Sequence, residues 1–251
     1  MNIVALIPAR AGSKRIINKN KKKLLGKPLI SWTIDTVKKV KEVSDIFVST
    51  DDKDIIGIAK KLKVKAPWLR PKKLCTDSAS SVDVAVHFLN WYEKKYKSVD
   101  GLLLLQPTSP FRKKSSIIKA IKLFKKNKNS SVISFSFYLK RLLNNTSSAI
   151  NEFKGAPTDK KTIKQKTLEL IYLSSNKSKD SIKRLNLKKL SVINGSIYLI
   201  SPKNLRKYKS MAPPRIKPLV QNSVLESIDI DTLSDWKIAS ALYKYKSKNN
   251  N

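Results

Sequence analysis

The chain has 251 residues, of which 53 are lysine or arginine and 18 are aspartate or glutamate, so its formal net charge is +35. Its 41% of hydrophobic residues can form a core, which excludes a disordered polycation. The single cysteine, Cys75, excludes an intramolecular disulfide and a cysteine-based metal site. The apolar run in residues 1–10 follows no basic segment, and no run has the ~18 apolar residues of a bilayer span. We therefore predict a cytoplasmic protein without membrane insertion.

The positive charge suggests nucleic-acid binding, but the kind of basic residue weakens that interpretation. Eight of these residues are arginines and 45 are lysines, spread over almost every segment. Arginine is the better bidentate ligand for phosphate and guanine. A uniform lysine excess beside many asparagines is typical of an AT-rich genome, and we favour that explanation. A basic nucleic-acid-binding protein is kept as the alternative from a different functional class.

Short apolar runs and amphipathic stretches alternate along the chain. In chain order, we expect a strand at 3–7, a helix at 29–40, a strand at 46–48, helices at 53–62 and 81–96, a strand at 102–105, a helix at 115–126, strands at 131–137 and 195–200, and a helix at 232–245. Alternation at this spacing predicts crossover units and therefore an α/β fold with a mostly parallel sheet.

One region interrupts this rhythm. Residues 138–192 are polar, rich in lysine and weakly periodic apart from a short apolar stretch. We interpret them as an insertion that caps the sheet or meets a partner subunit. The catalytic or binding core would then consist of residues 1–137 and 193–251.

The loop after the first strand has the composition of a phosphate site. Cationic and small residues gather there in the order Arg10, Gly12, Ser13, Lys14, Lys19 and Asn20. Glycine and serine can turn sharply and direct backbone N–H groups at an anion, which the neighbouring cations also attract. The loop is neither a Walker A sequence nor a Gly-x-Gly-x-x-Gly sequence. A solvated basic loop is the alternative interpretation of this stretch alone.

Two carboxylates, Asp229 and Asp231, stand at alternate positions before the last predicted helix, where Thr232 is expected to be the N-cap. In an extended segment both side chains can point toward one ion. Mg²⁺ is bound through one or two carboxylates plus phosphate oxygens and water, so the pair suits Mg²⁺, with Mn²⁺ as a second possibility. A helix-cap cluster is the alternative, and we expect that structural role for Asp51 and Asp52.

Five motifs follow one another over nearly the whole chain. They are Ile-Pro-Ala-Arg-x-Gly-Ser-Lys at 7–14, Leu-Arg-Pro with Thr-Asp-Ser-Ala-Ser-Ser at 69–81, Leu-Gln-Pro-Thr-Ser-Pro-x-Arg at 105–112, Asn-Gly-x-x-Tyr at 194–198 and Asp-Ile-Asp-Thr at 229–232. In sequence and order they resemble the CMP-N-acylneuraminate (CMP-sialic acid) synthetases, the acylneuraminate cytidylyltransferase family. The resemblance implies a Rossmann-like, three-layer nucleotide-diphosphosugar transferase fold, with residues 138–192 as a dimerisation insertion that contributes to the sugar pocket.

The resemblance also implies the reaction. The family is composed of cytidylyltransferases that join CMP from CTP to the anomeric hydroxyl of an acidic nine-carbon sugar and release pyrophosphate. We expect a Mg²⁺-dependent homodimer that acts on a nonulosonic acid of the sialic or legionaminic type. A cytidylyltransferase for pseudaminic acid or 3-deoxy-manno-octulosonic acid is the nearest alternative. A catalytically inactive homologue is a further one, which the intact Lys19 and the two aspartates disfavour.

The residue roles expected here come from the same resemblance. Three are expected to be catalytic: Lys19, Arg10 and Asp231. CTP is expected to contact Arg10, Gly12, Ser13, Lys14, Lys19, Asn20, Arg70, Ala79 and Ser81. The sugar is expected to contact Gln106, Thr108, Ser109, Arg184, Asn194 and Tyr198. The metal ligands would be Asp229 and Asp231, and either carboxylate or a hydroxide on the metal would take the hydroxyl proton.

The chain departs from the family pattern on the sugar side. Val192 stands where the family often has an arginine. The family's basic residue after the strand at 131–137 has no clean match here, and Lys140 and Arg141 are no more than candidates for it. These departures leave the exact sugar open. Away from the motifs, we expect a structural role for His87 inside its helix, and we expect Arg112 to support the loop at 106–110.

Overall fold

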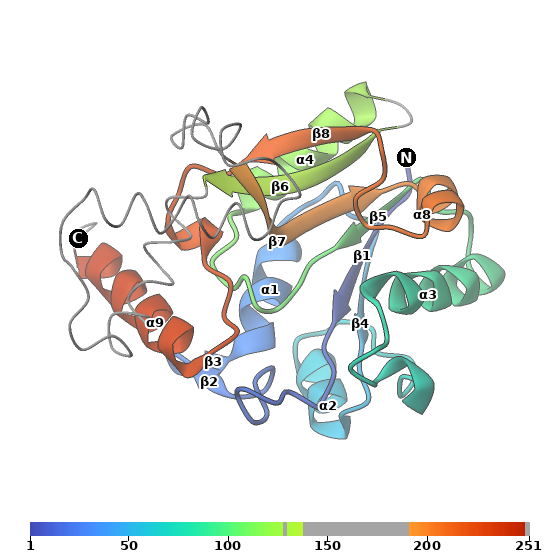
Figure 1. The fold of residues 1–251 in the computed structure, drawn as a ribbon. Helices are drawn as coiled ribbons and strands as arrows, with labels where there is room; N and C mark the ends of the chain where they lie inside the picture. Colours follow the sequence, from blue (N-terminus) through green and yellow to red (C-terminus); the bar gives the residue numbers. More distant parts are fainter. Residues whose placement is uncertain (128–129, 138–190, 249–251) are drawn as a thin grey trace, which may run out of the picture.

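The computed structural model describes residues 1–127, 130–137 and 191–248 (Figure 1). The strands are β1 (Ile3–Pro8), β2 (Lys23–Leu24), β3 (Lys27–Pro28), β4 (Asp45–Ser49), β5 (Gly101–Leu104), β6 (Ser131–Phe137), β7 (Ser191–Ile200) and β8 (Ile216–Val220). The helices are α1 (Leu29–Val37), α2 (Lys53–Lys61), α3 (Ser81–Lys95), α4 (Lys114–Lys126), α8 (Pro202–Tyr208) and α9 (Leu233–Lys248), with short 3-10 helices η1 (Lys72–Leu74) and η3 (Leu225–Ser227).

Six of these strands form one sheet in the order β4-β1-β5-β7-β6-β8. β1 pairs in parallel with β4 and β5, and β6 pairs in parallel with β8. β7 lies between β5 and β6 and is antiparallel to both. The expected α/β class with a mostly parallel sheet is confirmed, and the position of β7 is what the hydrophobic pattern alone did not reveal.

The sheet is the middle of three layers (Figure 1). Ile3, Ala5 and Ile7 of β1 belong to the hydrophobic cluster that includes α1, α2 and α4, whereas Val4 and Leu6 belong to the cluster that includes α3 and α8. All five side chains are completely buried. This strand is apolar throughout because it is covered on both faces, as expected for a central strand of a parallel sheet.

A third cluster joins the two ends of the chain. Ile16 and Leu24, in the segment after β1, pack with Ile228 and Ile230 and with Ala239 of α9. These contacts hold the segment before α9 against the loop after β1, although the two are more than 200 positions apart (Figure 1). The packing therefore brings together the cationic loop and the Asp-x-Asp segment identified in the sequence.

The sequence pattern did not indicate α8 or β8. β8 has the sequence Ile-Lys-Pro-Leu-Val and is the last strand in the sheet order, with only Leu219 buried. A short edge strand tolerates lysine and proline because one side of it makes no ladder hydrogen bonds. Its weak alternation is a consequence of that place in the sheet.

The predicted insertion at 138–192 falls almost wholly outside the described residues, and its boundary and its dimerisation role stay predictions. β7 begins at Ser191, just before the predicted return of the core. Within the described ranges, the helices include none that is long and apolar enough to cross a bilayer.

Candidate active site

A cleft of about 480 Å³ lies where β1 and β5 end. Its wall comes from the loop after β1, the segment before α3, the loop after β5 and the segment before α9. The lining residues are Pro8, Arg10, Ser13, Lys14, Arg15, Ile16, Lys19, Asn20, Arg70, Asp77, Ala79, Ser80, Ser81, Val84, Gln106, Pro107, Thr108 and Asp231. Ligands bind at the carboxyl ends of strands in open α/β sheets, so the cleft has the expected location.

Most of the residues predicted to bind substrates meet in this cleft. Those that line it are Arg10, Ser13, Lys14, Lys19, Asn20, Arg70, Ala79, Ser81, Gln106, Thr108 and Asp231. Gly12, Ser109, Asn194, Tyr198 and Asp229 are not among the lining residues. Arg184, Lys140 and Arg141 lie outside the described residues. The roles of all these residues stay predictions. The structure does show that those lining the cleft come from four distant segments.

Hydrogen bonds fix the loop after β1 at both of its ends. The backbone N–H of Ala11 donates to Oδ1 of Asp51 over 2.8 Å, and Nδ2 of the buried Asn20 donates to the carbonyl oxygen of Arg10 over 3.0 Å. Asp52 caps α2 by accepting the N–H of Asp54. Asp51 and Asp52 thus have the structural roles expected for them. The loop is held in place by the protein, which leaves its cationic side chains to face the cleft.

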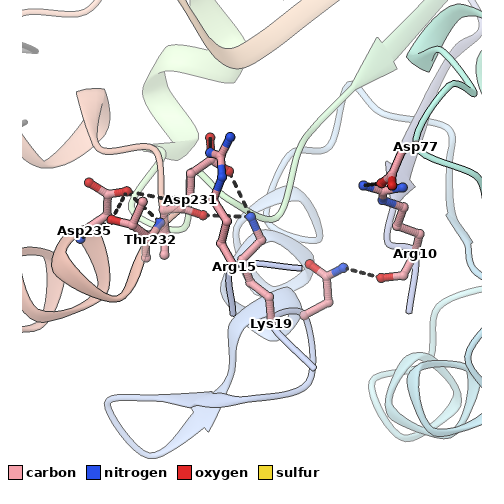
Figure 2. Close-up of polar contacts among 9 residues, drawn as sticks. Arg10, Arg15, Lys19, Asp77, Asp231, Thr232 and Asp235 are labelled. Atoms are coloured by element: carbon pink, nitrogen blue, oxygen red, sulfur yellow. Dashed lines mark hydrogen bonds and ion pairs between the residues drawn. The ribbon is translucent and has the colours of Figure 1, made fainter. Parts of the chain in front are cut away.

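Lys19 is the most enclosed cation of the cleft that forms an ion pair. Its side chain is 13% exposed, and Nζ donates to Oδ1 of Asp231 and to the carbonyl oxygen of Ile230, both over 2.9 Å. The guanidinium of Arg15 approaches the other carboxylate oxygen of Asp231 at 3.8 Å (Figure 2). An ammonium held at two points is oriented before any substrate arrives, which is what electrostatic stabilisation of developing charge requires.

The segment before α9 is fixed independently of Lys19. The N–H of Ile230 donates to the carbonyl oxygen of Thr108 over 2.8 Å. Asp235 accepts from the N–H groups of Asp231 and Thr232, and Oγ1 of Thr232 accepts from the N–H of Asp235 over 3.2 Å (Figure 2). The expectation that Thr232 caps the helix is confirmed, in a reciprocal capping arrangement. Because Asp235 satisfies these N–H groups, the carboxylate of Asp231 is left to face the cleft.

Asp229 has a different environment from Asp231. It is partly buried and lies outside the lining of the cleft. It also acts on the buried Arg112, because burial lowers the pKa of that guanidinium to about 9 against the opposing influence of Glu226 and, to a smaller extent, of Asp229. The described residues hold no group of three or more His, Cys, Asp or Glu side chains suited to a metal ion. The two carboxylates are therefore not equivalent with respect to the cleft.

Asp77 is a site residue that sequence reasoning missed. Its carboxylate forms ion pairs with Arg10 at 2.8 Å and with Lys14 at 2.5 Å. Hydrogen bonds from Lys14 and Arg10 hold the pKa of Asp77 below its ordinary value. The only sign in the sequence was its place between Arg70 and Ser81, inside the second nucleotide motif.

Arg70 is anchored at the end of β4. It is 6% exposed, its Nε donates to Oγ of Ser49 over 3.0 Å, and its guanidinium also donates to the carbonyl oxygen of Ser49. Burial lowers the pKa of Arg70. Ser80 caps α3 in a reciprocal capping box with Asp83, which fixes the chain direction through Ala79 and Ser81. These residues present a rigid polar wall to the cleft.

The loop after β5 supplies the neutral part of the cleft. Gln106 and Thr108 line it, and the hydroxyls of Thr108 and Ser109 are buried without a hydrogen-bond partner among the described residues. Arg112 holds this loop, since its guanidinium donates to the carbonyl oxygens of Gln106 and Ser196, each over 2.8 Å. The expected supporting role of Arg112 is confirmed. A buried hydroxyl without a partner is costly, so Thr108 is a candidate to bind a substrate oxygen.

The Asn-Gly-x-x-Tyr motif acts on the cleft through packing. Asn194 is 2% exposed. Its Oδ1 accepts a hydrogen bond from the hydroxyl of Ser134, and its Nδ2 donates one to Oε1 of Gln221. Gly195 has φ +74°, and a Cβ there would lie 3.2 Å from Oε1 of Gln106. Tyr198 packs partly buried against the core on the α3 side. The motif therefore packs behind the side chain of Gln106, and the expected contacts of Asn194 and Tyr198 with the sugar stay predictions.

The chain is similar to known proteins over most of its length. The family model described as cytidylyltransferase matches residues 4–211. The chain is 34% identical over 242 residues to CMP-N,N'-diacetyllegionaminic acid synthase of Legionella pneumophila, with 96% of each chain covered. It is 40% identical over 122 residues to an N-acylneuraminate cytidylyltransferase of Escherichia coli, which covers 49% of this chain and 28% of that protein. It is 36% identical over 129 residues to a pseudaminic acid cytidylyltransferase of Campylobacter jejuni, which covers 51% and 56% of the two chains.

A solved structure of CMP:2-keto-3-deoxy-manno-octonic acid synthetase complexed with CTP has the same fold, with a TM-score of 0.64, 15% identity and coverage of 98% of this chain and 100% of that one. This likeness confirms the predicted transferase fold. The family match favours an enzyme over the nucleic-acid-binding alternative. Since the family model spans most of the chain and a relative matches it from end to end, the protein belongs to the cytidylyltransferase family, whose members are nucleotidyltransferases.

Proposed function

We propose that the enzyme transfers CMP from CTP to the anomeric hydroxyl of a nonulosonic acid of the sialic or legionaminic type. The observation that carries the proposal is the composition of the cleft, which is lined by the cationic residues Arg10, Lys14 and Lys19 together with the neutral polar residues Gln106 and Thr108. The cations suit a triphosphate, and the neutral groups suit the hydroxyls and carboxylate of an acidic sugar. The end-to-end similarity to a CMP-N,N'-diacetyllegionaminic acid synthase supports this sugar class.

In the proposed reaction, the anomeric oxygen attacks the α-phosphorus of CTP. The bond from that phosphorus to the oxygen bridging the α- and β-phosphates breaks, pyrophosphate leaves, and the hydroxyl proton is released. Negative charge shifts onto phosphoryl oxygens, so catalysis depends on positioning and on fixed positive charge. Lys19 supplies that charge at the α-phosphate, while Arg10 and Lys14 hold the leaving phosphates.

The nucleoside half of CTP would lie against the segment before α3. Arg70 together with Ala79 and Ser81 would bind the cytosine, and Asn20 would approach the ribose. The wall is rigid because Arg70 is tied to Ser49 and the helix start is capped by Ser80. Fixed donors and acceptors on a base edge allow strong discrimination between cytosine and other bases.

The cleft also suits a Mg²⁺ ion bound between protein and substrate. Asp231 lines the cleft at the side of Lys19, and Mg²⁺ takes one or two carboxylates plus phosphate oxygens instead of a cage made only of protein. We propose Asp231 as its main ligand, with Asp229 as the second. A bound Mg²⁺ would neutralise phosphate charge and orient the attacking hydroxyl. The homodimer and the cytoplasmic location stay predictions.

The proposal is tested by pyrophosphate release with CTP, Mg²⁺ and a panel of acidic sugars. We expect the highest kcat/KM with N-acetylneuraminic or N,N'-diacetyllegionaminic acid, and little release when CTP is replaced by UTP or ATP. A higher kcat/KM with pseudaminic acid or 3-deoxy-manno-octulosonic acid would instead support the alternative, a cytidylyltransferase for that sugar. No release with any sugar, together with salt-dependent binding to DNA, would instead favour the nucleic-acid alternative.

Gly195→Ala tests whether the Asn-Gly motif shapes the sugar side. The added Cβ would lie 3.2 Å from Oε1 of Gln106 at a backbone φ of +74°. We expect a loss of about 1–2 kcal/mol in the free energy of unfolding and a several-fold higher KM for the sugar with little change in the KM for CTP. Gly57→Ala is the control, because its Cβ meets no atom within 4 Å and it lies inside α2. Equal effects on both KM values would contradict this role.

A further inference from the structure

The cations proposed for the leaving phosphates are already paired in the structure. Asp77 lies between η1 and α3, and its carboxylate bridges Arg10 and Lys14 at 2.8 and 2.5 Å. Figure 2 shows this pair well apart from the group formed by Lys19 and Asp231. A carboxylate thus occupies the part of the cleft where the proposed function places phosphate oxygens.

Asp77 and a triphosphate cannot both take the same donors. Arginine and lysine donate to both carboxylates and phosphates, so a phosphate that takes the N–H groups now donating to Asp77 displaces its carboxylate. The Asp77 side chain is 48% exposed, which leaves it free to turn toward water when the phosphates arrive. Hydrogen bonds from Lys14 and Arg10 lower the pKa of Asp77, so it carries its charge at neutral pH and competes as an anion.

We propose that Asp77 is an internal competitor of the β- and γ-phosphates and thereby sets the affinity for both CTP and pyrophosphate. It pairs with Arg10 and Lys14 in the empty enzyme, gives way to the triphosphate, and pairs with them again as pyrophosphate leaves. This inference rests on the proposed function, because it requires that phosphates bind at these two cations. Asp77 is not expected to touch the reacting atoms. It should affect CTP binding and pyrophosphate release, not the chemical step.

Asp77 also precedes the segment that would bind the nucleoside half of CTP, so its pairing can affect that segment as well. Ala79, Ser80 and Ser81 follow Asp77 directly and line the same cleft. When Asp77 is paired, it ties the start of this segment to the loop after β1 through Arg10. Displacement of the carboxylate by phosphate releases that tie at the moment when the nucleotide is bound. Phosphate binding at Arg10 and Lys14 would therefore make the segment that follows Asp77, which lies at the proposed cytosine site, more mobile.

The test compares wild type with Asp77→Asn by calorimetric titration of CTP and, separately, of pyrophosphate, each with Mg²⁺. Two partly exposed ion pairs predict dissociation constants that are about three- to tenfold lower in the variant. The dissociation constant of the variant should also rise more steeply with added salt, because phosphate then meets unpaired cations instead of exchanging for a carboxylate. The Ki of pyrophosphate as a product inhibitor should fall by the same factor.

Two further variants make the comparison specific. Asp77→Glu retains the charge and should stay close to wild type in affinity and in salt dependence. Asp35→Asn removes the same charge from an ion pair with Lys27 away from the cleft, and it should leave both dissociation constants unchanged. Equal or weaker binding by D77N, while wild type binds CTP, would overturn the inference alone. Failure of wild type to bind either CTP or pyrophosphate would overturn the proposed function and the inference with it.

Discussion

Replacing Lys19 with alanine should lower kcat by about 100- to 1,000-fold, the loss typical when one preorganised donor to a developing oxyanion is removed. Lys19 is 13% exposed and is held by Asp231 and the carbonyl oxygen of Ile230, so its ammonium has little freedom to move elsewhere. Steady-state pyrophosphate release with saturating CTP and sugar measures the effect. The melting temperature of the variant should stay near that of wild type.

The controls for this experiment lie on the same loop. Lys19→Arg retains the charge in a different shape and should recover part of the lost rate. Lys21→Ala removes a lysine two positions away, which pairs with Asp52 and Asp54 and does not line the cleft, so its kcat should change less than twofold. If K19A and K21A had the same kcat, the ammonium of Lys19 would have no special part in the reaction.

Asp231→Asn should lower kcat by about 100-fold or more in the presence of Mg²⁺, because it removes the proposed main ligand of an ion that would supply several kcal/mol of charge stabilisation. The Mg²⁺ concentration that gives half of the maximal rate should rise as well. In the empty cleft, Asp231 is also the ion-pair partner of Lys19. CTP binding measured without divalent cations should therefore be no weaker in the variant than in wild type, although its kcat is lower.

Metal removal separates the two roles of Asp231. With chelator present, wild type and Asp231→Asn should be equally slow, because the difference between them depends on the bound ion. A variant that is slower than wild type even under chelation would show that Asp231 acts mainly by orienting Lys19. Wild-type kcat with an unchanged Mg²⁺ requirement would remove Asp231 from the proposed metal site.

The sequence predicted most elements of the core because their patterns are local. β1 and β5 are uninterrupted apolar runs covered on both faces, and β6 has the bounds that the pattern indicated. The antiparallel position of β7 between β5 and β6 was not predictable in this way, because strand order depends on contacts between distant segments. β8 was missed because an edge strand containing Pro218 has neither a continuous run nor clear alternation.

The candidate site was predictable to the extent that its residues stand in motifs. Lys19, Gln106 and Asp231 meet in one cleft, as the order of the motifs suggested. The partners of the charged groups were not predictable, because the pairing of Asp77 with Arg10 depends on how two loops face each other across the cleft. The hydrogen bonds of Asn194 with Ser134 and Gln221 were also not predictable from its motif, because both partners lie in other segments of the chain.

The contact between Lys19 and Asp231 joins positions 212 residues apart, and the cluster around Ile16 and Ile230 holds the same two segments together. Synthesis proceeds at about 5–20 residues per second. The ribosome therefore makes Asp231 about 10–40 seconds after Lys19. The cleft can therefore be completed only after the segment before α9 has been made and has packed against the loop after β1.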